Sequence, residues 1–351
     1  MIISMKLHAT SQEVEEVCKQ VQAFGYKVHS IQGEERVVIG VVGLGDVTAC
    51  LESVEAMPQV ESVVRISAPY KFVSKEFRAA RTQIRVDGKE IGGQEFAVMA
   101  GPCSVESEDQ ILRAAEGVAR AGAKFLRGGA FKPRTSPYEF QGLEREGLKL
   151  LQKAKRATGL AIVTEVMSDR DVALVAEHAD MLQVGARNMQ NFVLLKALGK
   201  CGRPVLLKRG LSSTVKELLM SAEYVVAHGN SEVCLCERGI RTFETATRNT
   251  CDLCAVPVLN EATHLPVIVD PSHATGKRSL VPALCRAAVA IGADGLLVEV
   301  HPAPEKAFSD GAQSLNIPQF EKMMRDLQPY LHLWGEARML EAADLASAAK
   351  P

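Results

Sequence analysis

Short apolar runs and amphipathic stretches alternate along the chain from Phe96 onward. The apolar runs are short enough for buried strands, and they are FAVMAG, AKFLRGG, AIVTEV, MLQVGA, PVLLKRG, EVCLCERG, LPVIVDPS and DGLLVEVH. Stretches with helical periodicity, such as SEDQILRAAEGVARAG, separate them. Apolar strands that alternate with helices in this way favour a closed (β/α)8 barrel, the TIM-barrel form of the α/β class, over an open sheet. We assign residues 94–340 to this barrel and 341–351 to a C-terminal tail.

Residues 1–67 predict a separate small domain. The strand candidate IISMKLHA precedes a helix, SQEVEEVCKQVQAFG, which Ser11 is expected to cap and in which Val14, Val17 and Val21 share one face. Two strands, a second helix near 46–57 and a last strand, VESVVRIS, complete the order βαββαβ of a ferredoxin-like sandwich. Domains of this type bind effectors, make subunit contacts or play a purely structural role, and the pattern does not choose among these.

The segment between the two domains, residues 68–93, predicts a linker followed by a short hairpin.

Composition adds little to this picture but excludes some functions. Lys and Arg total 41 against 42 Asp and Glu, which argues against a general surface for nucleic acid or anionic membrane. We find no apolar stretch of about 18 residues that would span a membrane. Nine cysteines in a chain of this length do not indicate a disulfide framework, so we expect a cytoplasmic, reduced protein.

Charged or metal-capable side chains follow every predicted strand of the barrel. In (β/α)8 barrels the functional site lies at the C-terminal ends of the strands, so these positions test the prediction. In chain order they are Cys103; Arg127, with Lys132 and Arg134 in its loop; Glu165; Arg187; Lys208 and Arg209; Glu237 and Arg238; Asp270 and His273; Glu299 and His301.

Six of these residues form a cationic group on a protein without net positive charge. They are Arg127, Lys132, Arg134, Arg187, Lys208 and Arg238. Convergent Arg and Lys side chains suit phosphate or carboxylate groups, and six cations match two phosphates and one carboxylate better than a single phosphate. The alternative is that some of the cations pair with Glu165, Glu237 or Asp270.

A second group combines thiol, imidazole and carboxylate side chains: Cys103, His273, Glu299 and Asp310. Such a set suits a divalent ion of Mn, Fe, Co or Zn without choosing among them, although the spacings are long.

Other cysteines and histidines compete with this group as candidates. Cys251 and Cys254 fall in an expected helix, and Cys234 and Cys236 share one face of a strand, so packing explains both pairs. We expect His178 and His264 to be ordinary surface or boundary residues.

The barrel motifs resemble those of 3-deoxy-D-arabino-heptulosonate 7-phosphate (DAHP) synthases, in particular the short bacterial branch with an N-terminal ferredoxin-like regulatory domain. The motifs are AGPCSVES, RGGAFKPRTSPYEFQG, TEVM, QVGARNMQN, LLKRG, ERGIRTF, VDPSHATG and VEVHPAPEKAFSDG. The resemblance implies condensation of phosphoenolpyruvate with erythrose 4-phosphate, which releases phosphate and opens the shikimate pathway to chorismate and the aromatic amino acids.

By motif position, the resemblance also implies roles for individual residues. The metal ligands are Cys103, His273, Glu299 and Asp310. The residues for phosphoenolpyruvate are Arg127, Lys132, Arg187, Lys208 and Arg238, and those for erythrose 4-phosphate are Lys132, Pro133, Arg134, Thr135 and Ser136. Lys132 is expected to donate a proton near the aldehyde oxygen, and Glu165 to orient or deprotonate the attacking water.

Two alternatives accompany this resemblance. A sibling synthase of 3-deoxy-octulosonate 8-phosphate uses arabinose 5-phosphate on a similar barrel, but its loop typically has Lys-Ala-Asn-Arg-Ser where this chain has Lys132-Pro133-Arg134-Thr135-Ser136. A non-catalytic effector-binding protein would be expected to lose Cys103, His273 or this loop. The family likeness further implies feedback inhibition by tyrosine or phenylalanine through the N-terminal domain, and a homotetramer.

Overall fold

The computed structural model describes residues 1–32, 36–43, 48–64, 69–133 and 136–348. The chain divides into two compact units, Met1–Ala79 and Ala80–Pro351. The first carries the expected ferredoxin-like order and the second the expected barrel, so the predicted fold class is confirmed. In the described part of the chain, no helix combines the length and apolar character that a membrane span requires.

The first unit is a four-stranded antiparallel sheet with two helices. The sheet order is β2-β3-β1-β4. The elements are β1 (Ile2–Met5), α1 (Ser11–Ala23), β2 (Lys27–Gln32), β3 (Val37–Val42), α2 (Thr48–Glu55) and β4 (Val60–Val64). Apolar residues of both helices, among them Val17 and Val54, are buried in one core with Ile3 and Ile39 of the sheet. Because each helix is apolar on one face only, packing on the sheet is what buries that face.

Helix α1 is capped by Thr10 rather than by Ser11, which corrects the sequence prediction. The Thr10 hydroxyl accepts a hydrogen bond from the backbone N–H of Glu13, and the Glu13 carboxylate accepts one from the backbone N–H of Thr10. This capping box satisfies two N–H groups at the helix start and leaves Ser11 as the first helical residue.

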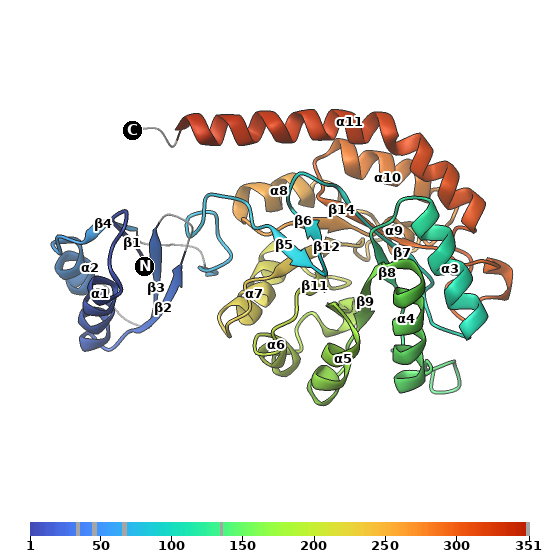
Figure 1. Cartoon of the computed structure of the whole chain (residues 1–351), viewed down its shortest axis with the longest axis horizontal. Helices are drawn as coiled ribbons and strands as arrows, with labels where there is room; N and C mark the ends of the chain where they lie inside the picture. The colour runs from blue at the N-terminus through green and yellow to red at the C-terminus, as the bar shows by residue number, and fades with distance from the viewer. Residues whose placement is uncertain (33–35, 44–47, 65–68, 134–135, 349–351) are drawn as a thin grey trace. The chain divides into compact units, whose positions relative to one another are not determined.

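Eight parallel strands close the barrel of the second unit (Figure 1). In barrel order the strands are β7 (Ala97–Gly101), β8 (Phe125–Arg127), β9 (Ala161–Glu165), β10 (Met181–Val184), β11 (Val205–Lys208), β12 (Val233–Glu237), β13 (Val267–Val269) and β14 (Gly295–Glu299). All strand residues are buried, as expected for strands covered by side chains inside and by helices outside.

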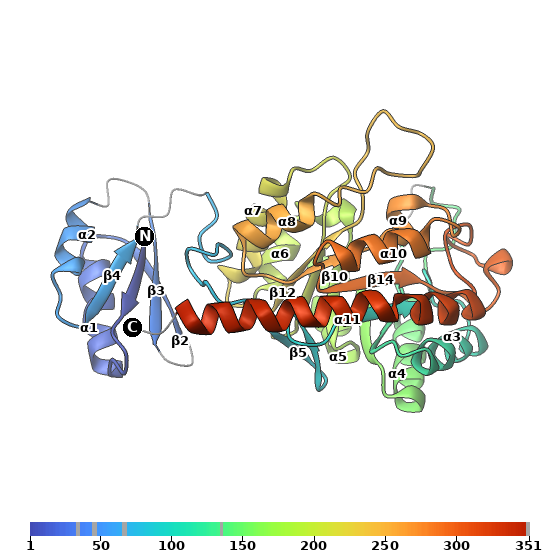
Figure 2. The same cartoon turned by 90° about the horizontal axis from the view of Figure 1, so that it is seen from above.

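The barrel helices follow the strands in alternation. They are α3 (Glu108–Arg120), α4 (Glu144–Thr158), α5 (Val172–His178), α6 (Phe192–Leu198), α7 (Val215–Val226), α8 (Ala255–Ala262), α10 (Val281–Ala290) and α11 (Ile317–Ala348). The short helix α9 (Pro271–Thr275) is inserted after β13. Helix α11 packs against α10 and α3, and it continues beyond residue 340, where we placed the end of the barrel (Figure 2).

These elements test the predictions for both cysteine pairs. Cys234 and Cys236 are both buried in the barrel core, as expected from their shared strand face. Cys251 lies in the loop before α8 and Cys254 is its N-cap, so the pair is not inside a helix as predicted. In the segment before the helix, Asp252 accepts a hydrogen bond from Arg209 Nη1, and its N–H donates to Glu237 Oε1.

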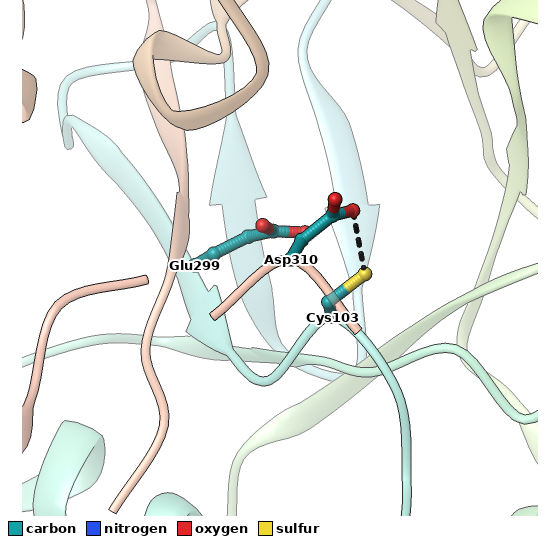
Figure 3. Close-up of side chains that lie close together, drawn as sticks. All are labelled: Cys103, Glu299 and Asp310. Atoms are coloured by element: carbon teal, nitrogen blue, oxygen red, sulfur yellow. Dashed lines mark hydrogen bonds between the residues drawn. The ribbon is translucent and has the colours of Figure 1, made fainter. Parts of the chain in front are cut away.

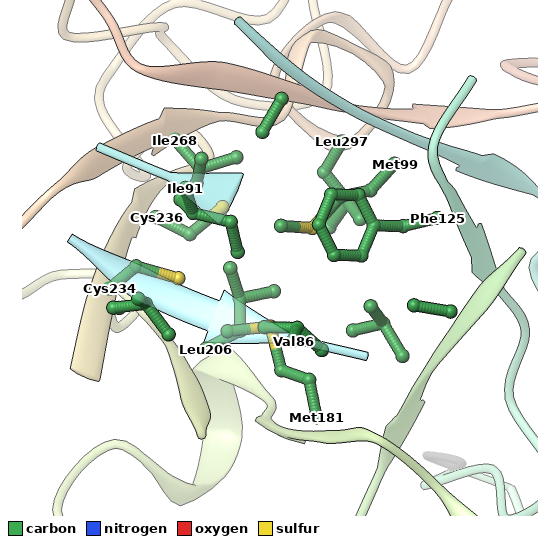
Figure 4. Close-up of a cluster of buried hydrophobic side chains, with 14 residues drawn as sticks. Val86, Ile91, Met99, Phe125, Met181, Leu206, Cys234, Cys236, Ile268 and Leu297 are labelled. Carbon is green, nitrogen blue, oxygen red and sulfur yellow. The ribbon is translucent and has the colours of Figure 1, made fainter. Parts of the chain in front are cut away.

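The N-terminal end of the barrel is closed by the hairpin of β5 (Ile84–Val86) and β6 (Lys89–Ile91). Its apolar residues, such as Val86 and Ile91, join one core cluster with Met99, Phe125 and Met181 of the barrel strands (Figure 4). The barrel is therefore a packed core and not a pore.

His264 is buried at this end, which corrects our expectation of a surface or boundary residue. Its Nδ1 lies 2.6 Å from the Thr82 hydroxyl, and its carbonyl oxygen accepts a hydrogen bond from the Thr82 N–H. The chain that enters the hairpin packs over the histidine and removes it from solvent. His178, in contrast, is partly exposed on α5, as expected.

Candidate functional site

A cavity of about 300 Å³ lies at the C-terminal ends of the barrel strands. The residues that line it are Arg127, Lys132, Pro133, Glu139, Glu165, Gln183, Gly185, Ala186, Arg187, Lys208, Arg238, Arg248, His273 and Asp310. Most of the described residues that the sequence singled out for substrate binding are therefore brought together around one space.

Two of the predicted cations are paired with carboxylates, and one of these pairs, Lys208 with Asp270, is of the kind that the alternative interpretation named. Arg127 donates from Nη1 to Glu299 Oε1 at 3.1 Å, and Lys208 forms a buried ion pair with Asp270. A third pair, between Arg209 Nη1 and Glu237 Oε2 at 2.8 Å, lies outside the cavity lining. These pairs hold buried carboxylates in place at strand ends.

Other cations of the cavity, such as Arg187 and Arg238, are not neutralised by a neighbouring carboxylate of the described residues. In the described part of the chain, neither Arg187 nor Arg238 forms an ion pair, and the buried Nε atoms of Arg127 and Arg238 have no hydrogen-bond partner. Unpaired buried donors are costly in a folded protein. A cavity lined by such groups favours an anionic ligand that can accept hydrogen bonds.

Lys132 lies at the floor of the cavity and is buried. Its Nζ donates to the carbonyl oxygen of Cys103 at 3.1 Å and lies 3.1 Å from the Cys103 Sγ. Burial alone would lower the pKa of this ammonium group, but the neighbouring Cys103 and Glu165 raise its pKa above the usual value. Gly129 makes room for this arrangement, because a Cβ there would come within 2.7 Å of the Lys132 Cδ and 2.8 Å of the Cys103 carbonyl oxygen.

Glu165 faces the same cavity from the end of β9. Gln183 donates to its Oε2 at 3.4 Å, and both side chains are buried. Gly185 lies so close that a Cβ there would come within 2.0 Å of Glu165 Oε1. Any larger residue at position 185 would therefore displace the carboxylate from its place beside the cavity.

Cys103, Glu299 and Asp310 form a metal-capable cluster beside the cavity. One ligand atom from each lies within 4.8 Å of the others, and the Cys103 Sγ donates to Asp310 Oδ2 at 3.2 Å (Figure 3). Bond lengths of about 2.0–2.3 Å put two ligands of one ion at most about 4.6 Å apart, so the cluster is close to the spacing that a divalent ion needs. The thiol and carboxylate donors suit the ions expected from the sequence.

His273, the fourth predicted ligand, lies on α9 next to this cluster but is not among the residues whose ligand atoms all lie within 4.8 Å of one another. Its Nε2 lies 3.5 Å from Glu299 Oε1 and 4.0 Å from Asp310 Oδ2, while its Nδ1 lies 2.7 Å from Asp270 Oδ2. An Nδ1–H that donates to Asp270 leaves the Nε2 lone pair directed at the cluster. Burial also lowers the pKa of His273, which favours the neutral, ligand-competent imidazole.

The charge states of the cluster follow from the same neighbours. Burial, together with the negative charge of Glu299, raises the pKa of the Cys103 thiol to about 12. Burial would also raise the pKa of the Asp310 carboxyl, but the positive charges of His273, when it is protonated, and of Arg248 lower this pKa. The cluster thus presents an ionised carboxylate next to a thiol that a bound cation would help to deprotonate.

Part of the predicted aldose-phosphate loop lies outside the described residues, namely Arg134 and Thr135. Pro133 lines the cavity. Ser136 accepts a hydrogen bond from the Tyr138 N–H at 3.3 Å and is not part of the cavity lining.

His301, another residue at a predicted strand end, is not part of the cavity lining. Its Nε2 lies 3.3 Å from Glu106 Oε2, and its Nδ1 accepts a hydrogen bond from the Ala303 N–H. The histidine therefore connects the loop after β14 to the loop after β7.

Arg248 is the main cavity residue that sequence reasoning missed. It lies well after the end of β12, so an inspection of residues at strand ends did not include it. Its Nη1 donates to Asp310 Oδ1 at 3.0 Å and to Gln313 Oε1 at 2.8 Å. The sequence signal that could have pointed to Arg248 is its position in the segment that follows the ERGIRTF motif.

The fold and the site define a (β/α)8-barrel enzyme whose cationic cavity adjoins a metal-capable cluster. Comparison with known proteins identifies its family. The model of the DAHP synthetase I family matches residues 77–332, and that of the DAHP synthase ferredoxin-like domain matches residues 1–68. The chain belongs to the DAHP synthetase I family, and the resemblance recognised in its motifs is confirmed.

Individual relatives agree with this assignment. The chain is 48% identical over 328 residues to the phospho-2-dehydro-3-deoxyheptonate aldolase of Thermotoga maritima, which covers 93% of this chain and 97% of that protein. A crystal structure of phospho-2-dehydro-3-deoxyheptonate aldolase (DAHP synthase) from the same organism matches with a TM-score of 0.76 and 47% identity, over 95% of this chain and 98% of that one. A 2-dehydro-3-deoxyphosphooctonate aldolase of Acidithiobacillus ferrooxidans is 34% identical over 269 residues, which cover 71% of this chain and 95% of that protein.

Proposed function

We propose that the protein is a 3-deoxy-7-phosphoheptulonate synthase, a transferase of the aldol-type carboligase kind. It condenses phosphoenolpyruvate with erythrose 4-phosphate and releases phosphate, at the entry to the shikimate pathway. The observation that carries this proposal is the cationic cavity directly beside the Cys103, Glu299 and Asp310 cluster, in a chain whose relative across nearly its full length has the same named activity.

The cavity cations divide into two substrate sites. Arg127, Lys132, Arg187, Lys208 and Arg238 bind the phosphate and carboxylate of phosphoenolpyruvate. The loop Lys132, Pro133, Arg134, Thr135 and Ser136 binds the phosphate of erythrose 4-phosphate. Two anionic substrates repel each other, so an excess of fixed cations is needed to hold them together in a geometry for attack.

Cys103, His273, Glu299 and Asp310 would hold one divalent ion of Mn, Fe, Co or Zn. The donor types and their separations fit such an ion. When bound, the ion supplies Lewis-acid polarisation of the aldehyde oxygen of erythrose 4-phosphate.

The side chains of the cavity handle the protons of the reaction. Lys132 is held in its charged form at the floor of the cavity, so it can donate a proton near the aldehyde oxygen as C3 of phosphoenolpyruvate attacks that carbon. Glu165 lies across the same space, where it orients or deprotonates the water that adds to C2 of phosphoenolpyruvate. Addition of water gives a hemiketal phosphate, and loss of its phosphate yields the product.

Two features favour erythrose 4-phosphate over arabinose 5-phosphate. The ferredoxin-like domain at residues 1–68 matches a DAHP synthase domain, and the octulosonate relative aligns with 71% of this chain rather than with its whole length. The Pro133-Arg134-Thr135 triplet differs from the Ala-Asn-Arg of the sibling family and contains a proline that restricts the loop.

A direct assay tests the function. The full chain is mixed with phosphoenolpyruvate, Mn²⁺ and either aldose phosphate, and phosphate release is followed. We expect turnover with erythrose 4-phosphate at least about tenfold faster than with arabinose 5-phosphate, a difference of about 1.4 kcal/mol in activation free energy. Chelation should abolish turnover and added Mn²⁺ should restore it. Equal or faster turnover of arabinose 5-phosphate would assign the protein to the sibling activity.

The N-terminal domain is proposed to bind tyrosine or phenylalanine as a feedback inhibitor, in a homotetrameric, cytoplasmic enzyme. The match of residues 1–68 to a DAHP synthase domain supports a role tied to this enzyme family. Initial rates measured with each amino acid in turn test the effector, and sedimentation tests the tetramer. Rates that neither amino acid changes would exclude both as effectors.

A further inference from the structure

Two side chains outside the predicted metal ligands contact the carboxylates of the metal-capable cluster. Gln313 is buried, and its Nε2 donates to Glu299 Oε2 at 2.7 Å. Its Oε1 accepts a hydrogen bond from Arg248 Nη1 at 2.8 Å, and the same Nη1 donates to Asp310 Oδ1 at 3.0 Å. One continuous chain of hydrogen bonds therefore joins Glu299, Gln313, Arg248 and Asp310.

This chain of bonds decides which oxygen of each carboxylate is directed at the cluster. Since Asp310 uses Oδ1 for Arg248, its Oδ2 is left facing Cys103 Sγ at 3.2 Å and His273 Nε2 at 4.0 Å. Since Glu299 uses Oε2 for Gln313, its Oε1 is on the side of the cluster, 3.5 Å from His273 Nε2, where it also accepts a hydrogen bond from Arg127 Nη1 at 3.1 Å. Each carboxylate thus has one oxygen bonded to Gln313 or Arg248 and the other on the side where an ion would bind.

Gln313 has the chemistry that this position requires. Its neutral amide offers one acceptor to the Arg248 guanidinium and one donor to the Glu299 carboxylate. The reversed amide orientation would place NH2 against the guanidinium and oxygen against the carboxylate, so the network itself defines the orientation. A glutamate at this position would place two carboxylates in contact.

The backbone of the β12–α8 loop brings Arg248 to this point. The Arg248 N–H donates to the Thr275 carbonyl oxygen at 3.0 Å, and Asn249 Nδ2 donates to the His273 carbonyl oxygen at 2.8 Å. Gly276, with a φ of +67°, lies against the Arg248 side chain, and a Cβ there would come within 2.5 Å of the Arg248 Cβ. The loop is therefore fastened to α9, the helix that carries His273.

We propose that Arg248 and Gln313 are positioning residues for the metal site, which orient Asp310 and Glu299 so that one oxygen of each faces the ion. This inference rests on the proposed function, because it assumes that the cluster holds a divalent ion. It adds residues from the β12 and β14 loops that act through the ligands rather than on substrate. Groups that hydrogen-bond to metal ligands typically change metal affinity about 10- to 100-fold when they are removed.

Cobalt binding to the full-length, metal-stripped protein tests the inference. Co²⁺ is titrated into the wild type, Gln313→Leu, Arg248→Met and Arg248→Lys, and the thiolate-to-cobalt absorption from Cys103 is followed. We expect Gln313→Leu and Arg248→Met to weaken Co²⁺ binding about tenfold or more. Arg248→Lys, which keeps a cationic donor, should bind more tightly than Arg248→Met. The KM values of Gln313→Leu for both substrates at saturating metal should stay within about threefold of the wild type, because Gln313 does not line the cavity.

Arg241→Ala is the matched control. Arg241 lies in the same loop and is exposed, and it is not part of the cavity lining, so its variant should bind Co²⁺ like the wild type. Thermal unfolding of each metal-free variant shows whether it is folded. Because Gln313 and Arg248 are in different loops, a folding defect in one variant still leaves the other as a test.

The possible results separate the inference from the proposed function. If the wild type shows no thiolate-to-cobalt absorption, the proposed metal site fails and the inference fails with it. If the wild type binds Co²⁺ and a folded Gln313→Leu or Arg248→Met variant binds it equally well, only the inference is overturned. Unchanged Co²⁺ affinity with a KM for erythrose 4-phosphate raised tenfold in Arg248→Met would make Arg248 a substrate-binding residue instead.

Discussion

At the N-terminal end of the barrel a buried carboxylate is shared by two arginines, whereas at the C-terminal end some cations have no carboxylate partner among the described residues. At the N-terminal end, the buried Asp294 accepts hydrogen bonds from both Arg81 and Arg338. At the C-terminal end, Arg187 and Arg238 form no ion pair with any described residue. The difference shows that one end is organised for stability and the other for binding anions.

Apolar packing differs between the two ends in the same sense. The β5–β6 hairpin fills the N-terminal end, with Ile84, Val86 and Ile91 fully buried among residues of the barrel strands. The C-terminal end keeps a cavity of about 300 Å³ lined largely by polar groups. Substitutions at the two ends should therefore separate loss of activity from loss of stability.

The largest effect is expected for Lys132→Met. The variant loses the buried ammonium group beside Cys103 and Glu165, so kcat should fall about 10²–10³-fold, or about 3–4 kcal/mol in activation free energy. The thermal midpoint should fall only slightly, because the desolvation cost of the buried ammonium group offsets much of its attraction to Cys103 and Glu165. Steady-state kinetics and thermal unfolding give the two readouts, and Lys149→Met on the exposed face of α4 is the control. A kcat like that of the wild type would contradict the role of Lys132.

Asp294→Ala should instead lower the stability of the protein and leave its activity nearly unchanged. It leaves the guanidinium groups of Arg81 and Arg338 without their shared carboxylate, and it leaves the Val267 N–H without its acceptor. The free energy of unfolding of the barrel should fall by about 3 kcal/mol, while kcat of the folded enzyme stays within about twofold. Denaturant titration and kinetics measure these quantities. Asp109→Ala, at an exposed pair on α3, should change neither. A large drop in kcat without destabilisation would break the distinction between the two ends.

Ile91→Ala tests the apolar part of the N-terminal end and should have the smallest effect of the three. The side chain is fully buried in the hairpin, and its truncation should lower the free energy of unfolding by about 2 kcal/mol through lost burial and a residual cavity. Ile91→Val, which removes one methylene, should cost about 1 kcal/mol. If neither variant changed stability, the hairpin would not be part of the cooperative core.

Much of this architecture could be predicted from local pattern. Strands buried on both faces give continuous apolar runs, so the alternation after Phe96 predicted the barrel and thereby placed Arg127, Glu165 and Glu299 at one edge. The cap of α1 was displaced by one residue, because Thr10 and Ser11 are both suitable N-caps and only the reciprocal bond with Glu13 distinguishes them.

Pairing among the charges could not be predicted in the same way. That Lys208 pairs with Asp270, while Arg238 forms no ion pair with any described residue, depends on the directions of side chains from different strands. The burial of His264 likewise depends on Thr82, which is remote in sequence and packs over it.

The sequence by itself determined the succession of elements, the barrel with its ferredoxin-like companion, and the residue types at the strand ends. It could do so because backbone periodicity and burial are local properties, and because parallel strands of a barrel bring their C-terminal ends to one edge. The tertiary structure alone decided that Arg248 reaches Asp310, that Gln313 holds Glu299, and that the hairpin closes the opposite end. These contacts join loops far apart in the chain, where long-range packing rather than local pattern sets which side chains meet.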